Sequence, residues 1–67
     1  MDTLADALPK EQARVRKLMI AYRQIGPAGR FALAMMEASL RSADKAAAEG
    51  DVAAMISCLE DLRGYKS

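Results

Sequence analysis

The sequence is poor in the residues that cross-link or chelate within small domains. It contains no histidine, no tryptophan and a single cysteine, Cys58, in 67 residues. One cysteine excludes a disulfide within the chain, and without histidine the usual zinc ligand sets and the common catalytic triads cannot be assembled. A chain this short is typically stabilised by a disulfide, a metal or a second copy of itself. We therefore expect no metal and no cofactor, and we expect self-association.

Long hydrophobic runs and strand patterns are also missing. The longest apolar run, FALAMM from Phe31 to Met36, is far too short to cross a bilayer. The N-terminal segment MDTLADALPK has no basic stretch followed by an apolar region, and nowhere do apolar and polar residues alternate as in a strand. These absences predict a soluble, cytoplasmic, all-α protein.

Charge is unevenly distributed, although the formal net charge is only +1. Between Lys10 and Arg30 six basic residues face one acid, Glu11, whereas from Phe31 onward six acids accompany four bases. A basic first part indicates a surface for an anionic partner, or it is simply a solvated helix face. The sequence leaves both interpretations open.

The first predicted helix spans about residues 4–25. Thr3 and Asp6 have the spacing of a capping box, and Pro9 must lie before the helix or within its first turns. Apolar residues recur at helical spacing on the face expected to be buried. They are Leu8, Val15, Leu18, Tyr22 and Ile25.

Two further helices are predicted after a turn in the segment IGPAG. The second spans about residues 28–49 and ends at Gly50, and the third spans about 52–63 with Asp51 as its N-cap. The expected fold is a single helical domain over residues 1–67, in which the N-terminal helix packs on an αα-hairpin.

The second predicted helix is apolar or small-sided over most of its circumference. Such a helix needs neighbours on at least two sides, and a three-helix monomer of this length can hardly supply them. We therefore predict a symmetric homodimer formed through this helix. The expected dimer residues are Tyr22, Phe31, Met35, Met36 and Leu40.

No arrangement of residues in the sequence is typical of an enzyme. Cys58 is expected at the edge of an apolar stripe, where it packs and does not react. The acids Glu60 and Asp61 are adjacent, so on a helix they diverge instead of converging on one substrate. The prediction is a non-enzymatic protein.

Basic side chains surround Ile20 on the outer surface of the first predicted helix. They would attract nucleic acid, but the sequence has no helix-turn-helix signature, few aromatic residues and little net charge. A protein partner accounts for both the basic surface and the association. The candidate partner-binding residues are Arg14, Arg16, Lys17, Ile20 and Arg23.

From Gly26 to Tyr65 the sequence resembles a group of small proteins from transposable phages and prophages. The shared pattern is a Gly or Pro turn, G-x-F, an apolar segment, ADxAxxxGD and then xAMI. The best-understood members of that group are anti-activator, or anti-quorum-sensing, proteins. Gly29, Phe31, Asp44, Gly50 and Met55 are among the residues that carry the match.

The resemblance implies a small helical homodimer, made early in infection inside the host bacterium. Its expected partner is the DNA-binding domain of a LuxR-type quorum-sensing activator, and some members of the group are also linked to inhibition of the type IV pilus assembly ATPase. Two alternatives stay open: a small nucleic-acid-binding regulator, and a structural or antitoxin-like interaction subunit.

Overall fold

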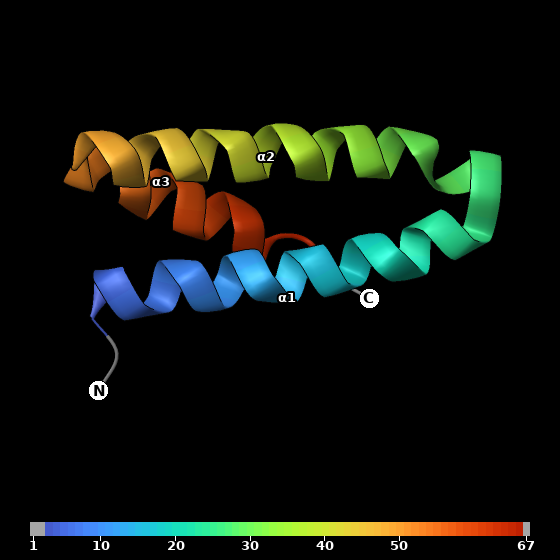
Figure 1. Ribbon diagram of the computed structural model, residues 1–67, viewed down its shortest axis with the longest axis horizontal. Helices are drawn as coiled ribbons and strands as arrows, with labels where there is room; N and C mark the ends of the chain where they lie inside the picture. The colour runs from blue at the N-terminus through green and yellow to red at the C-terminus, as the bar shows by residue number, and fades with distance from the viewer. Residues whose placement is uncertain (1–2, 67) are drawn as a thin grey trace.

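The structure is a computed structural model that describes residues 3–66. Those residues form three α-helices, α1 (Leu4–Ile25), α2 (Arg30–Glu49) and α3 (Val52–Arg63), with a 3₁₀ turn, η1 (Gly26–Gly29), before α2 (Figure 1). No residue in this range lies in a strand, so the all-α prediction is confirmed there. The helix ends agree with the predicted ones, except that α2 begins two residues later because the chain first winds through η1.

A capping box at Thr3 starts α1 ahead of Pro9. The Thr3 Oγ1 accepts a hydrogen bond from the Asp6 amide at 3.3 Å, and the Asp6 carboxylate accepts one from the Thr3 amide at 3.4 Å. Pro9 therefore lies within the helix, where its ring removes the bond that would reach the carbonyl of Ala5. Both residues are exposed, so water can satisfy that carbonyl.

The turn between α1 and α2 depends on two glycines for different reasons. Gly26 has a φ of +82°, which only glycine adopts without strain. Gly29, in contrast, has an ordinary φ of −90°. It is needed because a Cβ there would collide with the backbone carbonyl of Tyr22. Gly29 thus lets η1 pack directly on α1.

The α2–α3 hairpin is closed by the predicted Gly50–Asp51 pair. Gly50 adopts the left-handed conformation, and the Gly50 and Asp51 amides donate to the Ala47 and Ala46 carbonyls at 3.2 and 3.1 Å. This pair of hydrogen bonds is the Schellman motif. The Asp51 carboxylate then accepts from the Ala54 amide at 3.1 Å, which caps α3.

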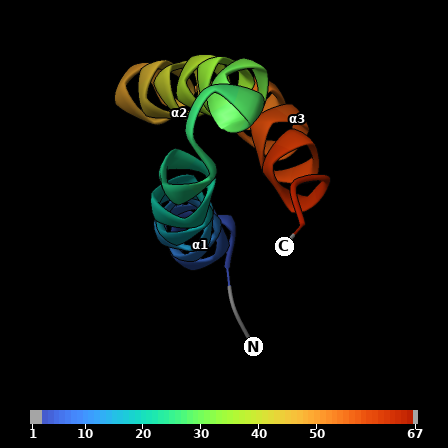
Figure 2. The same cartoon turned by 90° about the vertical axis from the view of Figure 1, so that its right-hand side faces the viewer.

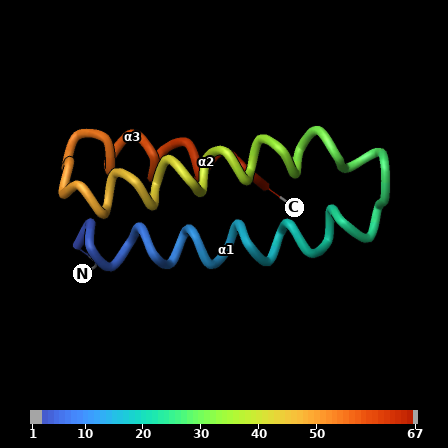
Figure 3. The backbone as a smooth tube through the Cα atoms, turned by 45° about the horizontal axis from the view of Figure 1, so that its top comes forward, coloured from blue at the N-terminus to red at the C-terminus, as the bar shows by residue number. Residues whose placement is uncertain are grey.

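The three helices are arranged as a triangular bundle when viewed along the long axis (Figure 2), and each contacts the other two. α3 runs back along only part of α2, so the N-terminal half of α2 extends beyond it and lies across from the C-terminal half of α1 (Figures 1 and 3). The buried cluster draws on all three helices. Its members are Leu8, Val15, Met19, Met36, Leu40, Ala43, Leu59 and Leu62.

The buried face of α1 is rotated and shortened relative to the prediction. Leu8 and Val15 are buried as predicted, but Gln12 and Met19 join them, whereas Ile25 is 57% exposed at the end of the helix. Ile25 precedes the turn, beyond the part of α1 that faces α3. Within residues 3–66, no helix combines the length and apolar character needed to cross a membrane.

Candidate interaction surface

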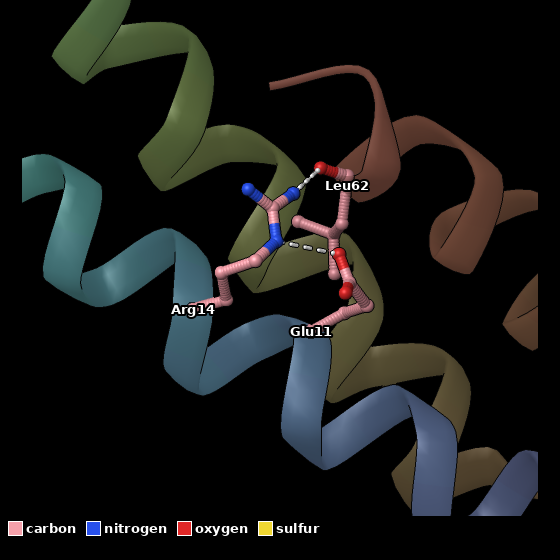
Figure 4. Close-up of polar contacts among 3 residues, drawn as sticks. All are labelled: Glu11, Arg14 and Leu62. Carbon is pink, nitrogen blue, oxygen red and sulfur yellow. Dashed lines mark hydrogen bonds and ion pairs between the residues drawn. The ribbon is translucent and has the colours of Figure 1, made fainter. Parts of the chain in front are cut away.

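Arg14, one of the predicted partner-binding residues, is held by two contacts within the fold. Its Nε donates to the Glu11 carboxylate at 3.0 Å and its Nη2 donates to the Leu62 carbonyl at 2.8 Å (Figure 4). The Leu62 carbonyl lies in the last turn of α3, where a cation is favoured by the helix dipole. Arg14, whose side chain remains 39% exposed, therefore ties α1 to the C-terminal end of α3.

Three of the five predicted partner-binding residues lie together on the opposite side of α1. Arg16, Ile20 and Arg23 line a groove of about 330 Å³ whose remaining walls are Met19 and Leu40. Met19 and Leu40 are 5% and 7% exposed, so they form an apolar floor, whereas Ile20 is 56% exposed. These five residues are called the α1–α2 groove below.

One acid, Asp44, lies near the groove. Its Oδ1 accepts a 2.7 Å hydrogen bond from the Nε2 of Gln12, and the same oxygen lies 3.9 Å from the Nη2 of Arg16. Gln12 is buried, whereas the side chains of Arg16 and Asp44 are both more than half exposed. The Gln12 bond is thus the stronger constraint on Asp44, and the Arg16 ion pair is long and solvated.

The other two basic side chains of this surface differ in position. Arg23 makes no ion pair with any residue in the range 3–66. Lys17 is exposed but does not line the α1–α2 groove. The structure therefore divides the predicted surface into three parts: Arg14, partly exposed and held by α3, Lys17 outside the groove, and Arg16, Ile20 and Arg23 at one groove.

The predicted dimer residues also separate. Met36 and Leu40 are 1% and 7% exposed and lie in the core of the single chain, so Met36 offers almost no surface to a second copy and Leu40 only the small part that lines the α1–α2 groove. Tyr22 is half-buried, and its hydroxyl donates to the Lys66 carbonyl at 3.3 Å. Phe31 and Met35, in contrast, are 77% and 47% exposed.

The exposed residues on this side of α2 follow helical spacing. Phe31 and Met35 are one turn apart, and the exposed small residues Ala34 and Ala38 lie beside them. We call these four residues the α2 outer face. They are the part of the predicted dimer surface that the fold leaves uncovered.

A second hollow, of about 460 Å³, is polar and lies between α1 and the C-terminal segment. It is lined by Glu11, Arg14, Arg63, Tyr65 and Lys66. Arg14 is engaged as described, and the Tyr65 hydroxyl lies 2.8 Å from the Ser39 hydroxyl. Two of its polar side chains thus already make contacts within the fold, Arg14 with the end of α3 and Tyr65 with α2.

The surroundings of Cys58, the single thiol of the sequence, favour its protonated form. Burial raises the pKa of the Cys58 thiol, and the carboxylates of Asp61 and Asp51 raise it further. A raised pKa keeps the thiol protonated, whereas a reactive cysteine needs a lowered one. Among residues 3–66 no cluster of three potential metal ligands occurs.

Sequence reasoning missed the residues whose role depends on a distant segment. The spacing of Glu11 and Arg14 signals a local ion pair, but nothing in the sequence places Arg14 against Leu62. Similarly, no pattern places Gln12 beside Asp44, 32 positions away. Met19 and Leu40 were visible as apolar residues, but their meeting beneath Ile20 follows only from the packing of α1 on α2.

Residues 3–66 thus form a small three-helix fold, and the two hollows described above are both open to solvent. Comparisons of the chain with models of known families, with curated proteins and with solved structures found no match. A function for the chain must therefore be argued from its surfaces and from the sequence resemblance.

Proposed function

We propose that this chain is a phage-derived, non-enzymatic inhibitor that acts by binding and covering a surface of a host protein. The partner that the sequence resemblance favours is the DNA-binding domain of a LuxR-type quorum-sensing activator, with the type IV pilus assembly ATPase as a further target. The inhibitor works in the cytoplasm of the host cell, and it works as a homodimer.

One observation carries the proposal: several large apolar side chains are exposed to solvent instead of contributing to the small core. Ile20, Phe31 and Met35 are each about half exposed or more. Single exposed apolar residues are common, but those that cluster with others usually mark a contact surface. Ile20 lies between two arginines at the α1–α2 groove, and Phe31 and Met35 lie together on the α2 outer face.

The overall dimensions support self-association. The chain exposes 4566 Å², whereas a compact monomer of its mass exposes about 4,100 Å². Its radius of gyration is 12.2 Å, whereas about 11 Å is expected for a compact domain of this length. The N-terminal half of α2, which extends past α3, contributes to this excess, so we propose the α2 outer face as the dimer interface.

Nucleic-acid binding is the second candidate function, and the structure weakens its support. Of the basic residues on α1, Arg14 is engaged by α3 and Arg16 lies beside Asp44. Two of the basic side chains of α1 thus already have a partner within the chain, whereas non-specific nucleic-acid binding depends on neutralising many phosphates. Such binding would weaken steeply with salt, and a mobility-shift titration of the chain alone on duplex DNA would reveal it.

The homodimer is tested by light scattering over a range of concentrations. We expect a mass twice the 7.2 kDa of the chain, reduced to that of one chain by the double substitution Phe31→Glu with Met35→Glu. Both side chains are exposed, so the variant should remain folded, as circular dichroism would check. Ala53→Glu, on an exposed position of α3, is the matched control and should stay dimeric. A wild-type monomer at every concentration would reject the dimer.

Inhibition is tested with a purified LuxR-type activator, its promoter DNA and the purified chain. We expect the wild-type chain to reduce the mobility shift caused by the activator, and to lower a reporter driven by that promoter in cells. The chain alone should not shift the DNA. Unchanged activator binding at saturating amounts of folded chain would contradict the proposed partner.

A further inference from the structure

We propose that the α1–α2 groove binds an acidic amphipathic helix of the partner protein. This inference rests on the proposed function, because it names the chemistry of the segment that the inhibitor captures. Three features of the groove support it: the spacing of its charges, its apolar floor and the weak hold on its arginines.

The spacing of the groove side chains matches a second helix. Arg16, Ile20 and Arg23 follow one another at i, i+4 and i+7, so they lie on one side of α1. At 1.5 Å of rise per residue the two arginines are about 10.5 Å apart along the axis. A partner helix that carries two carboxylates at the same seven-residue spacing, with an apolar residue between them, places opposite charges against both guanidinium groups.

The floor of the groove is suited to an apolar anchor. Met19 and Leu40 are almost fully buried by their own chain but still line the groove, while Ile20 stands exposed at its edge. An apolar side chain inserted there would contact all three residues. The flexible thioether of Met19 can adapt to anchors of different shape. A polyphosphate would gain nothing from this floor, so the groove favours a peptide over a nucleic acid.

Both arginines can accept a new carboxylate at little cost. The Arg16–Asp44 pair is long, at 3.9 Å, and joins two exposed side chains. Asp44 keeps its 2.7 Å hydrogen bond from Gln12 if Arg16 turns to a partner. Arg23 has no ion pair within residues 3–66. Binding therefore replaces one weak internal contact with two charge-assisted ones.

The test uses a fluorescein-labelled, alanine-based helical peptide with Glu, Leu and Glu at positions i, i+4 and i+7. A matched peptide carries Gln at both Glu positions. We expect the Gln peptide to bind wild-type chain about tenfold more weakly in fluorescence anisotropy. Ile20→Ser and Arg23→Gln should each weaken binding of the Glu peptide about tenfold. Lys17→Gln removes the same charge outside the groove and should change the affinity by less than about twofold.

Several results would overturn the inference. They are equal affinity for the Glu and Gln peptides, no binding of either, or a loss with Lys17→Gln as large as with Arg23→Gln. A fall in the self-associated mass of the Ile20→Ser variant would show that a second copy occupies the groove, and would also overturn it. Circular dichroism of each variant ensures that a loss of binding is not a loss of fold.

Failure here is distinguishable from failure of the proposed function. If Ile20→Ser and Arg23→Gln still inhibit the activator as the wild type does, the function stands and the groove is not the contact. If wild-type chain never inhibits the activator but binds the Glu peptide, the groove inference stands and the partner was misidentified.

Discussion

The inner and outer faces of α2 show how differently a fold can use similar residues. Met35 and Met36 are adjacent in the sequence, yet Met36 is 1% exposed within the core and Met35 is 47% exposed on the outer face. On a helix, neighbouring residues point about 100° apart, so α1 and α3 cover one and leave the other. Apolar character alone therefore does not separate residues that stabilise the chain from those available to a partner.

The strongest test of the difference between the two faces of α2 is to truncate Met35 and Met36 separately. Met36→Ala should lower the free energy of unfolding by about 2–5 kcal/mol, because it leaves a cavity in the core. Met35→Ala should change it far less in the monomer, by about 0.5 kcal/mol, since about half of the residue is already exposed to water. Urea unfolding at low protein concentration measures both, and equal effects would contradict the division of α2 into two faces.

A smaller effect on the free energy of unfolding is expected from Asp44, on the flank of α2 that faces α1. Asp44→Ala removes the partner of the buried Gln12 amide and should cost about 1 kcal/mol, moderated by water that reaches this exposed position. Glu37→Ala, another exposed acid of α2 without an ion pair in the described range, is the control and should be nearly neutral. If the two substitutions cost the same, the hydrogen bond to Gln12 contributes nothing measurable.

The smallest effect on stability concerns Cys58, whose burial lies between that of Met36 and that of Met35. Because its pKa is raised in the folded chain above the ordinary value of 9.0, the unfolded chain loses the thiol proton first as pH rises. The contribution of the protonated Cys58 thiol to the free energy of unfolding is thus fully present below the pKa of the unfolded chain and declines as the pH rises above it. The free energy of unfolding of the wild type minus that of Cys58→Ser should therefore fall from pH 8 to pH 10. A difference that grows over this range would contradict the raised pKa.

Reactivity gives an independent measure of the same thiol. At pH 8 the folded chain should react with a disulfide reagent more slowly than the urea-unfolded chain, because less thiolate is present and access is restricted. Equal rates would indicate that neither burial nor the nearby carboxylates affect Cys58.

The sequence alone determined where the helices begin and end, except at the start of α2, which η1 delays by two residues. Thr3 with Asp6, Gly50 and Asp51 act through hydrogen bonds within a few residues of themselves, so their roles could be predicted from spacing. The exposed position of Ile20 among basic residues was visible for the same reason, because helical periodicity fixes which neighbours share a face.

Only the tertiary structure decided how each face is used. The contacts of Arg14 with Leu62 and of Gln12 with Asp44 join residues 48 and 32 positions apart. The burial of Met36 beside the exposed Met35 depends on the angle at which α1 and α3 meet α2, and that angle follows from the packing of many side chains at once. Local sequence sets the periodicity of a helix. Which side of the helix is covered depends on packing between residues far apart in the sequence, so no short segment determines it.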